Sequence, residues 1–397
     1  VQASMRKERM GALLLTMEYH HRYLTGVDSQ FWASPTRPFF LVVPASGSIV
    51  AIVPTISESL YAELTHVVGA VKTWPAPRPD DDGVLLVLEA LQEALAAAGP
   101  DLQHIGAELG FEHSLRMPAN DFLALRQRLP GQADLLDATP LLQRLRAVKS
   151  EREIAVQTEA CQAQAAGLGR IPEVVRPGMT EKEWCRLVNV ELLKAGADRV
   201  LYMACRSGKG GYADIVGAPS ERALGEGDVL TVDAGTVVNG YWCDFNRNFY
   251  VGASVPAPIA AAHSALHRAV EAGLAAVRPG ASTADVFHAM LGEVQRAQGA
   301  GGGSTSDVGS VGRFGHGVGL AITEWPSLLP ASARQNVTLE AGMVLTLEPS
   351  MSYGEGRLLV HEEMVAVRPG GGELISLRTP AAMPVIAARS AAADGEL

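Results

Sequence analysis

One short segment occurs twice in the chain, and this repeat constrains the fold more than any other feature. Residues 227–233 read Gly-Asp-Val-Leu-Thr-Val-Asp and residues 342–348 read Gly-Met-Val-Leu-Thr-Leu-Glu, so the same strand pattern ends twice in a carboxylate. An Arg-Pro-Gly triplet precedes an expected helix at 176–178 and again at 278–280. The triplets and the strands are offset by 102 and 115 residues, in the same order. Such internal repeats indicate duplicated units. We expect two βα-type halves related by a pseudo-two-fold axis.

A separate α/β segment precedes the repeat. Residues 11–15, 38–44 and 48–54 are typical of buried strands, and residues 85–98 of a helix that ends at a Gly-Pro pair. The chain has 397 residues, which is too long for one ordinary hydrophobic core. We therefore predict three parts: an N-terminal α/β domain at 1–145, a C-terminal domain at 146–386 and a flexible tail at 387–397.

Composition excludes several classes of partner. The formal net charge is −10, and no run of Lys or Arg is present, which argues against binding to nucleic acid or an anionic membrane. No apolar stretch reaches the roughly 18 residues of a membrane span, and residues 1–10 lack the apolar core of a signal peptide. The four cysteines form no CxxC pair, so we expect reduced thiols in a cytoplasmic protein.

Each half of the repeat offers two carboxylates from a predicted hairpin. An Asn-Gly turn follows Asp233, and the return strand, expected at 241–251, would bring Asp244 back beside it. In the second half, Glu348 precedes a turn, and a strand expected at 358–367 carries Glu362. The repeat therefore predicts four carboxylates that face one cleft.

Four carboxylates in one cleft need cations, because like charges a few ångströms apart repel strongly where water is excluded. His316 lies between two glycines, which let the backbone come close and leave its ring unobstructed. Oxygen-rich ligands with one imidazole suit Mn, Fe, Co or Zn. Two such ions can turn a bridging water into a hydroxide near neutral pH. We predict two divalent ions held by five residues: Asp233, Asp244, His316, Glu348 and Glu362.

The segments around these residues resemble, in order, the motifs of the creatinase, prolidase and methionine-aminopeptidase family. They read Val-Asp-Ala-Gly, Gly-Tyr-Trp-Cys-Asp, Gly-His-Gly-Val-Gly, Leu-Glu-Pro and Glu-Glu-Met-Val, and they begin at 232, 240, 315, 347 and 362. Residues 31–38, Phe-Trp-Ala-Ser-Pro-Thr-Arg-Pro, look like that family's N-terminal domain. The resemblance implies a pita-bread fold in the C-terminal domain and an Asp-Asp-His-Glu-Glu dinuclear site.

The resemblance also implies a role for each ligand. Asp233 and Asp244 would hold one ion and His316 and Glu348 the other, while Asp244 and Glu362 would bridge the two. Glu348 would in addition take and pass the proton during attack. The family usually forms homodimers, in which the segment that here contains Trp32 would reach toward the site of the other chain.

The chain departs from the proline-specific peptidases of this family at three positions. Val216 and Thr323 stand where those peptidases usually carry histidines that assist the scissile carbonyl and the leaving group, and Val360 stands where they carry an arginine. Three residues are candidates to fill the gap as catalytic residues: Tyr212, Asp214 and Tyr241.

The function expected from these residues is metal-dependent hydrolysis of a small amide by a metal-bridged hydroxide. A Xaa-Pro dipeptide or a related short peptide is the simplest substrate. One alternative is a lyase that acts on dimethylsulfoniopropionate or a similar small molecule, because that branch of the fold resembles this chain at 323–326 and 360–363. Another is a non-catalytic binding protein that keeps the fold.

Overall fold

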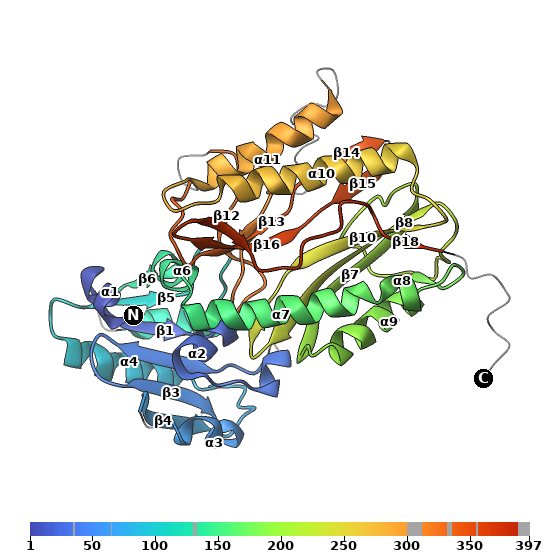
Figure 1. Cartoon of the computed structure of the whole chain (residues 1–397). Coiled ribbons are helices and arrows are strands. Elements are labelled where there is room, and N and C mark those ends of the chain that lie inside the picture. Colours follow the sequence, from blue (N-terminus) through green and yellow to red (C-terminus); the bar gives the residue numbers. More distant parts are fainter. Residues whose placement is uncertain are drawn as a thin grey trace. The chain divides into compact units, whose positions relative to one another are not determined.

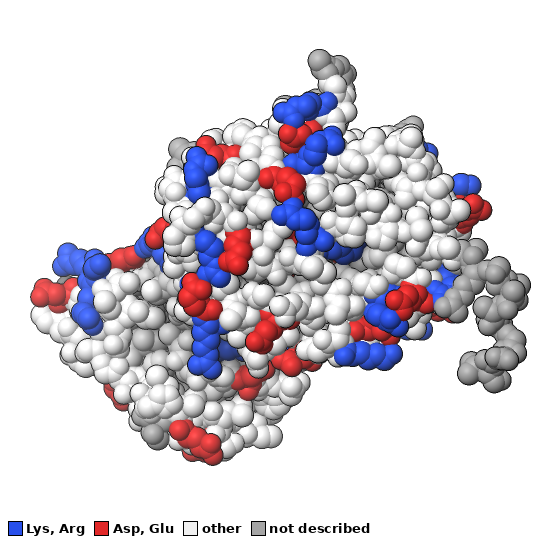
Figure 2. Space-filling view, viewed as in Figure 1, with Lys and Arg blue, Asp and Glu red and all other residues white. Residues whose placement is uncertain are grey.

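A computed structural model describes residues 1–34, 36–64, 66–129, 133–299, 312–331, 336–354 and 356–387. The chain divides into two compact units, Val1–Leu145 and Arg146–Leu397. We keep 1–145 and 146–386 as the proposed domains; beyond Ala387, the predicted tail lies outside the described residues. Among the described residues, every helix is too short or too polar to cross a membrane. Figure 2 shows basic and acidic side chains interspersed over the face in view.

The N-terminal unit is built on one six-stranded sheet with the order β4-β3-β2-β1-β5-β6. Its strands are β1 (Met10–Leu15), β2 (Phe40–Pro44), β3 (Ile49–Pro54), β4 (Val68–Trp74), β5 (His104–Ala107) and β6 (Leu135–Asp137). Its helices are α1 (Gln2–Lys7), α2 (Glu18–Thr25), α3 (Ser59–Ala62), α4 (Val84–Ala98) and α5 (Ala119–Arg128), with the short 3-10 helices η1 (Gln30–Ala33) and η2 (Thr55–Ser57). Every residue of β1 is buried, because side chains pack on both faces of the sheet. The three predicted strands and the predicted helix are confirmed.

Helix α6 (Thr139–Ala147) leads to the first half of the C-terminal unit, which has one sheet covered by helices. Strands β7 (Arg199–Lys209), β8 (Asp228–Val238) and β10 (Phe245–Val251) lie side by side, with β9 (Tyr241–Trp242) and β18 (Val385–Ile386) at the margins. Helix α7 (Glu151–Gly169) packs on β8 and α9 (Glu181–Lys194) on β7, with α8 (Ile171–Val174) between them in sequence (Figure 1, green).

The second half repeats this plan. Its sheet has the order β12-β11-β13-β16-β17. The strands are β11 (His316–Gly317), β12 (Glu324–Ser327), β13 (Val344–Leu347), β16 (Glu363–Arg368) and β17 (Gly371–Leu374), and a separate ribbon contains β14 (Ser350–Gly354) and β15 (Arg357–Val360). Helices α10 (Ala257–Ala276) and α11 (Thr283–Gln298) lie side by side and pack on the strands of this half (Figure 1, orange). The predicted duplication is confirmed.

The repeat extends to the helix starts. Thr180 accepts a hydrogen bond from the amide of Glu183, whose carboxylate bonds back, so this pair forms a capping box at the start of α9. In the second half, Ser282 and Asp285 form the same arrangement at the start of α11. The helices that follow the two Arg-Pro-Gly triplets, α9 and α11, thus begin with the same type of capping box.

Two predicted strands are wrong in one respect, because each is interrupted. The strand expected at 241–251 breaks at Cys243-Asp244, and the strand expected at 358–367 breaks at His361-Glu362. The amide of Asp244 points to the sulfur of Met364, 3.1 Å away, instead of to a neighbouring strand. At the second break the chain changes partner, since β15 pairs with β14 and β16 pairs with β13.

Candidate metal centre

The repeated strands deliver two of the five predicted ligands. Asp233 lies within β8, opposite Asn246 of β10, and the hydroxyl of Tyr202 on β7 lies 3.4 Å from its Oδ2. Glu348 follows Leu347, the last residue of β13. Both carboxylates therefore stand near the end of the repeated segment, as the duplication predicts.

The two strand breaks and β11 deliver the other three. Nε2 of His316 lies 3.6 Å from Oδ2 of Asp244 and 3.7 Å from Oε1 of Glu348. Asp244, His316 and Glu362 each offer a ligand atom within 4.8 Å of the others. Asp233 and Glu362 are close enough for each to alter the pKa of the other. The structure thus brings all five predicted ligands together.

Local hydrogen bonding orients the imidazole. Nδ1 of His316 lies 2.9 Å from the carbonyl oxygen of Gly317 and can donate to it, which leaves the lone pair of Nε2 facing the carboxylates. A Cβ at position 315 would meet the carbonyl oxygen of Thr346 at 2.2 Å, and one at 317 would meet that of Trp325 at 2.5 Å. Glycine at both positions is therefore required for β11 to lie this close to its neighbouring strands.

Burial changes the protonation states at the centre. Burial raises the pKa of Asp233 to about 6 and that of Glu348 to about 8, and it raises the pKa values of Asp244 and Glu362 well above normal. Burial, with the charge of Arg313, lowers the pKa of His316 to about 3, so its ring is neutral. Each of these shifts favours the neutral form of the side chain, because burial removes the water that would stabilise its charged form.

Several ligand atoms at the centre have no hydrogen bond among the described residues. They are Oδ1 of Asp233, Oε1 of Glu348 and Oε1 of Glu362. Buried polar atoms without partners are rare and call for an explanation. Three unpaired carboxylate oxygens beside a neutral imidazole nitrogen form a donor set that fits divalent Mn, Fe, Co or Zn.

These pKa shifts predict how the metal-free protein responds to pH. Between pH 6.5 and pH 8, folded Glu348 keeps a proton that it loses on unfolding, so stability falls as pH rises through this window. The loss should be about 1–2 kcal/mol for each carboxylate that keeps its proton. His316 affects the free energy of unfolding only below about pH 6.5, the pKa of an unfolded histidine. There the unfolded chain binds a proton that the folded protein does not, so stability falls as pH falls. Urea unfolding in chelator at pH 6.5 and pH 8 measures the effect, and stability that is unchanged or higher at pH 8 would contradict it.

The three predicted catalytic residues are engaged in other bonds. The hydroxyl of Tyr212 donates to Oδ1 of Asn248 at 3.0 Å and accepts from the amide of Val360 at 2.9 Å. Asp214 accepts from Arg206 at 2.9 Å, and Tyr241 donates to Oε1 of Glu153 at 3.0 Å. These bonds support β-strand and loop structure, and the catalytic roles of Tyr212, Asp214 and Tyr241 stay predictions.

The three residues that differ from the proline-specific peptidases, Val216, Thr323 and Val360, lie in different surroundings. Val216 is 80% exposed. The hydroxyl of Thr323 lies 3.3 Å from Nη2 of Arg313. Val360 is buried, and its carbonyl oxygen accepts bonds from the side-chain amides of Asn246 and Asn248. Neither Val216 nor Val360 offers a polar side chain to the centre, whereas Thr323 is linked to it through Arg313.

Sequence reasoning missed two polar residues that contact the ligands. Tyr202 reaches Asp233 across the β7–β8 pair. Nε of Arg313 lies 3.8 Å from Oε1 of Glu348. Arg313 stands three residues before His316 and two before the motif that begins at 315, so its closeness to that motif was the available signal. Tyr202 had no such signal, because its placement depends on the register of β7.

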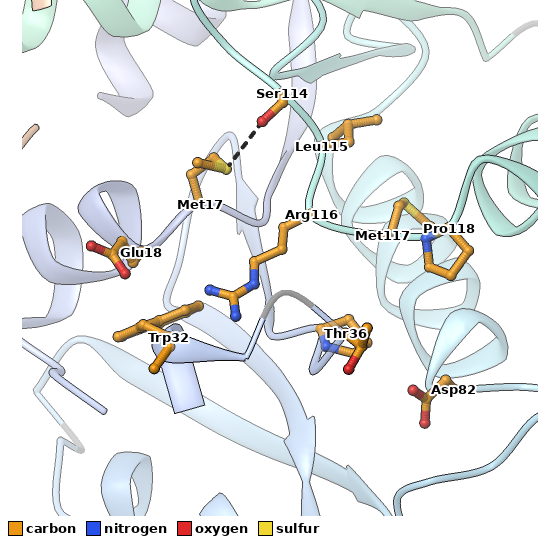
Figure 3. Close-up of a pocket in the computed structure, with 12 residues that line it drawn as sticks. Met17, Glu18, Trp32, Thr36, Asp82, Ser114, Leu115, Arg116, Met117 and Pro118 are labelled. Atoms are coloured by element: carbon orange, nitrogen blue, oxygen red, sulfur yellow. Dashed lines mark hydrogen bonds between the residues drawn. The ribbon is translucent and has the colours of Figure 1, made fainter. Parts of the chain in front are cut away.

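The N-terminal unit contains a cavity of about 660 Å³ of its own. Figure 3 shows Arg116 and Trp32 together in its wall, with the guanidinium carbon 4.9 Å from the ring centroid. Glu18 and Asp82 also line it. The described lining includes none of the five predicted ligands. The predicted role of Trp32 at a partner chain's site stays a prediction.

Comparisons with known proteins match both units. Residues 1–148 match the creatinase/prolidase N-terminal domain, and residues 156–369 match metallopeptidase family M24. A probable dipeptidase PepE of Mycobacterium bovis is 31% identical over 357 residues, which cover 88% of this chain and 84% of that protein. A Xaa-Pro dipeptidase of Pyrococcus furiosus is 28% identical over 208 residues, which cover 52% of this chain and 56% of that protein.

Solved structures agree with these matches. Dipeptidase PepE from Mycobacterium ulcerans superposes with a TM-score of 0.77 at 27% identity, covering 97% of this chain and 96% of that one. A recombinant prolidase from Thermococcus sibiricus superposes with a TM-score of 0.81 at 23% identity, covering 97% and 96%. The predicted creatinase-like α/β and pita-bread architecture is confirmed.

Proposed function

Because this chain belongs to metallopeptidase family M24 and is thus a metal-dependent hydrolase, we propose that it is a dipeptidase that cleaves the amide bond of a dipeptide, most simply of the Xaa-Pro type. The observation that carries the proposal is the convergence of four largely shielded carboxylates on one neutral imidazole, with three carboxylate oxygens unpaired among the described residues. The names of the related proteins, dipeptidase and Xaa-Pro dipeptidase, support the choice of substrate class.

The five ligands would hold two divalent cations. Asp233 and Asp244 would bind one and His316 and Glu348 the other, with Asp244 and Glu362 bridging. When bound, such a pair of ions supplies an activated water and Lewis-acid stabilisation of the charge that develops on the scissile carbonyl oxygen. Their charge would offset the repulsion among the four carboxylates that hold them.

Glu348 is the residue we assign to proton transfer. A carboxylate in this position can accept a proton and return it within one reaction. It lies beside His316, and its side chain is 13% exposed, more than that of Asp244 or His316. It can therefore take a proton from the attacking water and deliver it to the leaving amine.

Two further properties remain proposals. A homodimer is the expected assembly, and the mass in solution will test it. A cytoplasmic location is supported by four cysteines that are all buried and free of disulfides.

The test compares two reactions of the same purified protein. With Mn, Co, Zn or Fe(II) added, Ala-Pro and Leu-Pro should release free proline, chelator should abolish the release, and added metal should restore it. Release of dimethyl sulfide from dimethylsulfoniopropionate without peptide hydrolysis would instead establish the lyase. The substitutions at Val216 and Thr323 motivate that control. A protein that binds metal and catalyses neither reaction would be a binding protein.

A further inference from the structure

We propose that the ion pair of Arg247 and Glu363 positions Glu362 relative to Asp244, and so determines how tightly the centre holds its second metal ion. The inference rests on the proposed function and its two-ion centre. Neither member of the pair is one of the five predicted ligands. The two come from different halves of the repeat, since Arg247 belongs to β10 and Glu363 is the first residue of β16.

Both residues lie just beyond a strand break that contains a predicted ligand. Asp244 is in the break before β10, and Arg247 follows it by three residues. Glu362 is in the break before β16, and Glu363 follows it directly. The amide of Asp244 points to the sulfur of Met364 instead of to a neighbouring strand. Regular sheet pairing therefore does not fix these two ligands, and other contacts have to hold the backbone around them.

The guanidinium of Arg247 connects the two breaks. Its Nη1 donates to the carbonyl oxygens of Asn246, at 2.7 Å, and of Glu362, at 3.1 Å. Its Nη2 donates to Oε2 of Glu363 at 3.1 Å and to the carbonyl oxygen of Leu377. One planar group thus joins β10 to the backbone of Glu362. The side chain of Arg247 is 10% exposed, so water competes little for these bonds.

Glu363 gives the guanidinium a fixed partner. Its Oε1 accepts from the amide and from the hydroxyl of Thr379, both at 2.7 Å, and its Oε2 accepts from the hydroxyl of Ser376 as well as from Arg247. The side chain of Glu363 is 1% exposed. A buried carboxylate that accepts from several donors is held in one orientation, so the position of Arg247 is fixed as well.

Strand β10 also holds the chain before Glu362, but by separate bonds. The side-chain amides of Asn246 and Asn248 donate to the carbonyl oxygen of Val360, at 2.9 and 2.6 Å. That carbonyl lies two residues before Glu362, whereas Arg247 reaches the carbonyl of Glu362 itself. A variant of the ion pair would keep the two amide bonds. It therefore tests the position of Glu362 and not the whole junction between the halves.

The position of Glu362 matters most for the second ion. Asp244 and Glu362 are the residues proposed to bridge the two ions, and they and His316 offer ligand atoms within 4.8 Å of one another. A bridging carboxylate has to reach two ions at once, whereas a terminal ligand can follow one. Sites of this kind tolerate displacements of only about 0.5 Å. A displaced Glu362 would therefore weaken the second ion more than the first.

The test measures how many ions bind and how tightly. Glu363→Gln keeps the size of its side chain and removes the charge, and Arg247→Lys keeps the charge and removes the planar fork. Calorimetric titration of each metal-free, full-length protein with Mn(II) gives a Kd for each ion. Both variants should bind the first ion as the parent does. They should bind the second about 10- to 100-fold more weakly, the range for loss of an outer partner of a metal ligand.

Electron paramagnetic resonance gives a second readout that does not depend on catalysis. Two Mn(II) ions bridged by carboxylates couple magnetically. At a Mn(II) concentration that just fills both positions of the parent, the parent should show the coupled spectrum and the variants the spectrum of isolated Mn(II). Excess Mn(II) should restore both the coupled spectrum and the cleavage of Ala-Pro in the variants.

Glu181→Gln is the matched control. Glu181 is likewise 1% exposed, and it accepts from Arg206 and from the hydroxyls of Ser207 and Ser220. Its substitution thus removes a carboxylate of similar burial and bonding, whose partners in the described part of the chain include none of the five predicted ligands. Glu181→Gln should lower stability toward urea and leave the Kd of both ions unchanged.

Two results would overturn the inference. One is that Glu363→Gln and Arg247→Lys bind both ions as tightly as the parent, and the other is that Glu181→Gln weakens the second ion as much as they do. The proposed function is tested separately by the parent. If the parent binds two ions and the pair variants lose the second, but none of these proteins cleaves Ala-Pro, the proposed function fails and the positioning role stands.

Discussion

Asp244→Asn is expected to remove bound metal and hydrolysis together, with kcat/KM falling by about a thousandfold or more. Asp244 lies 3.6 Å from Nε2 of His316 and belongs to the one group of three candidate ligands that converge within 4.8 Å among the described residues. The cations would supply several kcal/mol of charge stabilisation in the transition state, and each 1.36 kcal/mol is tenfold in rate. Metal content per chain and proline release from Ala-Pro measure the two effects.

The same variant should behave differently when metal is absent. Burial and the charges of Asp233 and Glu348 raise the pKa of Asp244, so its carboxylate is costly without a cation. In chelator at pH 8, Asp244→Asn should therefore be at least as stable as the parent. Glu226→Gln, at an exposed position of the same unit, is the control and should change neither metal content nor rate. Normal metal content with full activity in Asp244→Asn would refute the assignment of this ligand.

Glu324→Gln is expected to destabilise the protein by about 3–5 kcal/mol, the usual cost of removing one partner from a buried ion pair. The side chains of Arg146, Lys149 and Glu324 are 8%, 2% and 6% exposed. Burial alone would raise the pKa of Glu324, but the two cations outweigh it and hold the pKa at about 2. The glutamine would remove the carboxylate that pairs with both buried cations.

Glu221→Gln provides the matched control for this prediction. Glu221 pairs with Lys182 at 2.7 Å, but the two side chains are 74% and 44% exposed, so the loss should stay below about 1 kcal/mol. Urea unfolding of the metal-loaded proteins compares the two variants. Equal losses would show that the buried cluster contributes no more than a surface pair.

Glu324 also connects stability to the metal centre. Its Oε1 accepts from the amide of Ala321 at 3.1 Å, and β12, which begins at Glu324, pairs with the strand of His316. A Cβ at position 319 would lie 2.6 Å from this carboxylate, so glycine there permits the close approach. We expect Glu324→Gln to weaken metal binding in addition to lowering stability.

The sequence predicted the parts of this site that depend on local pattern. The duplicated segment placed Asp233 and Glu348, because it ends in a carboxylate at equivalent points of the two halves. The Asn-Gly turn placed Asp244 on the returning chain, where Asn239 and Gly240 both adopt positive φ.

The parts that sequence could not predict depend on long-range packing. Alternation tells which face a residue occupies, but not that the strands break at Asp244 and at Glu362. At Asp244 the backbone amide turns to the sulfur of Met364, and at Glu362 the chain passes from the β14–β15 pair to the β13–β16 pair. The ion pairs of Glu324 join residues 178 and 175 positions apart. His361 likewise makes a long-range contact, with the ring of His263 at 5.7 Å between centroids, and its Nε2 lies 3.7 Å from Oε1 of Glu363.

The most direct test is diffraction at the absorption edge of a single added metal, collected from crystals of the intact protein. The proposed five-residue metal site predicts two anomalous peaks within bonding distance of Asp233, Asp244, His316, Glu348 and Glu362, and their loss in crystals of Asp244→Asn. Anomalous peaks confined to other residues, in crystals of protein that hydrolyses Ala-Pro, would contradict it.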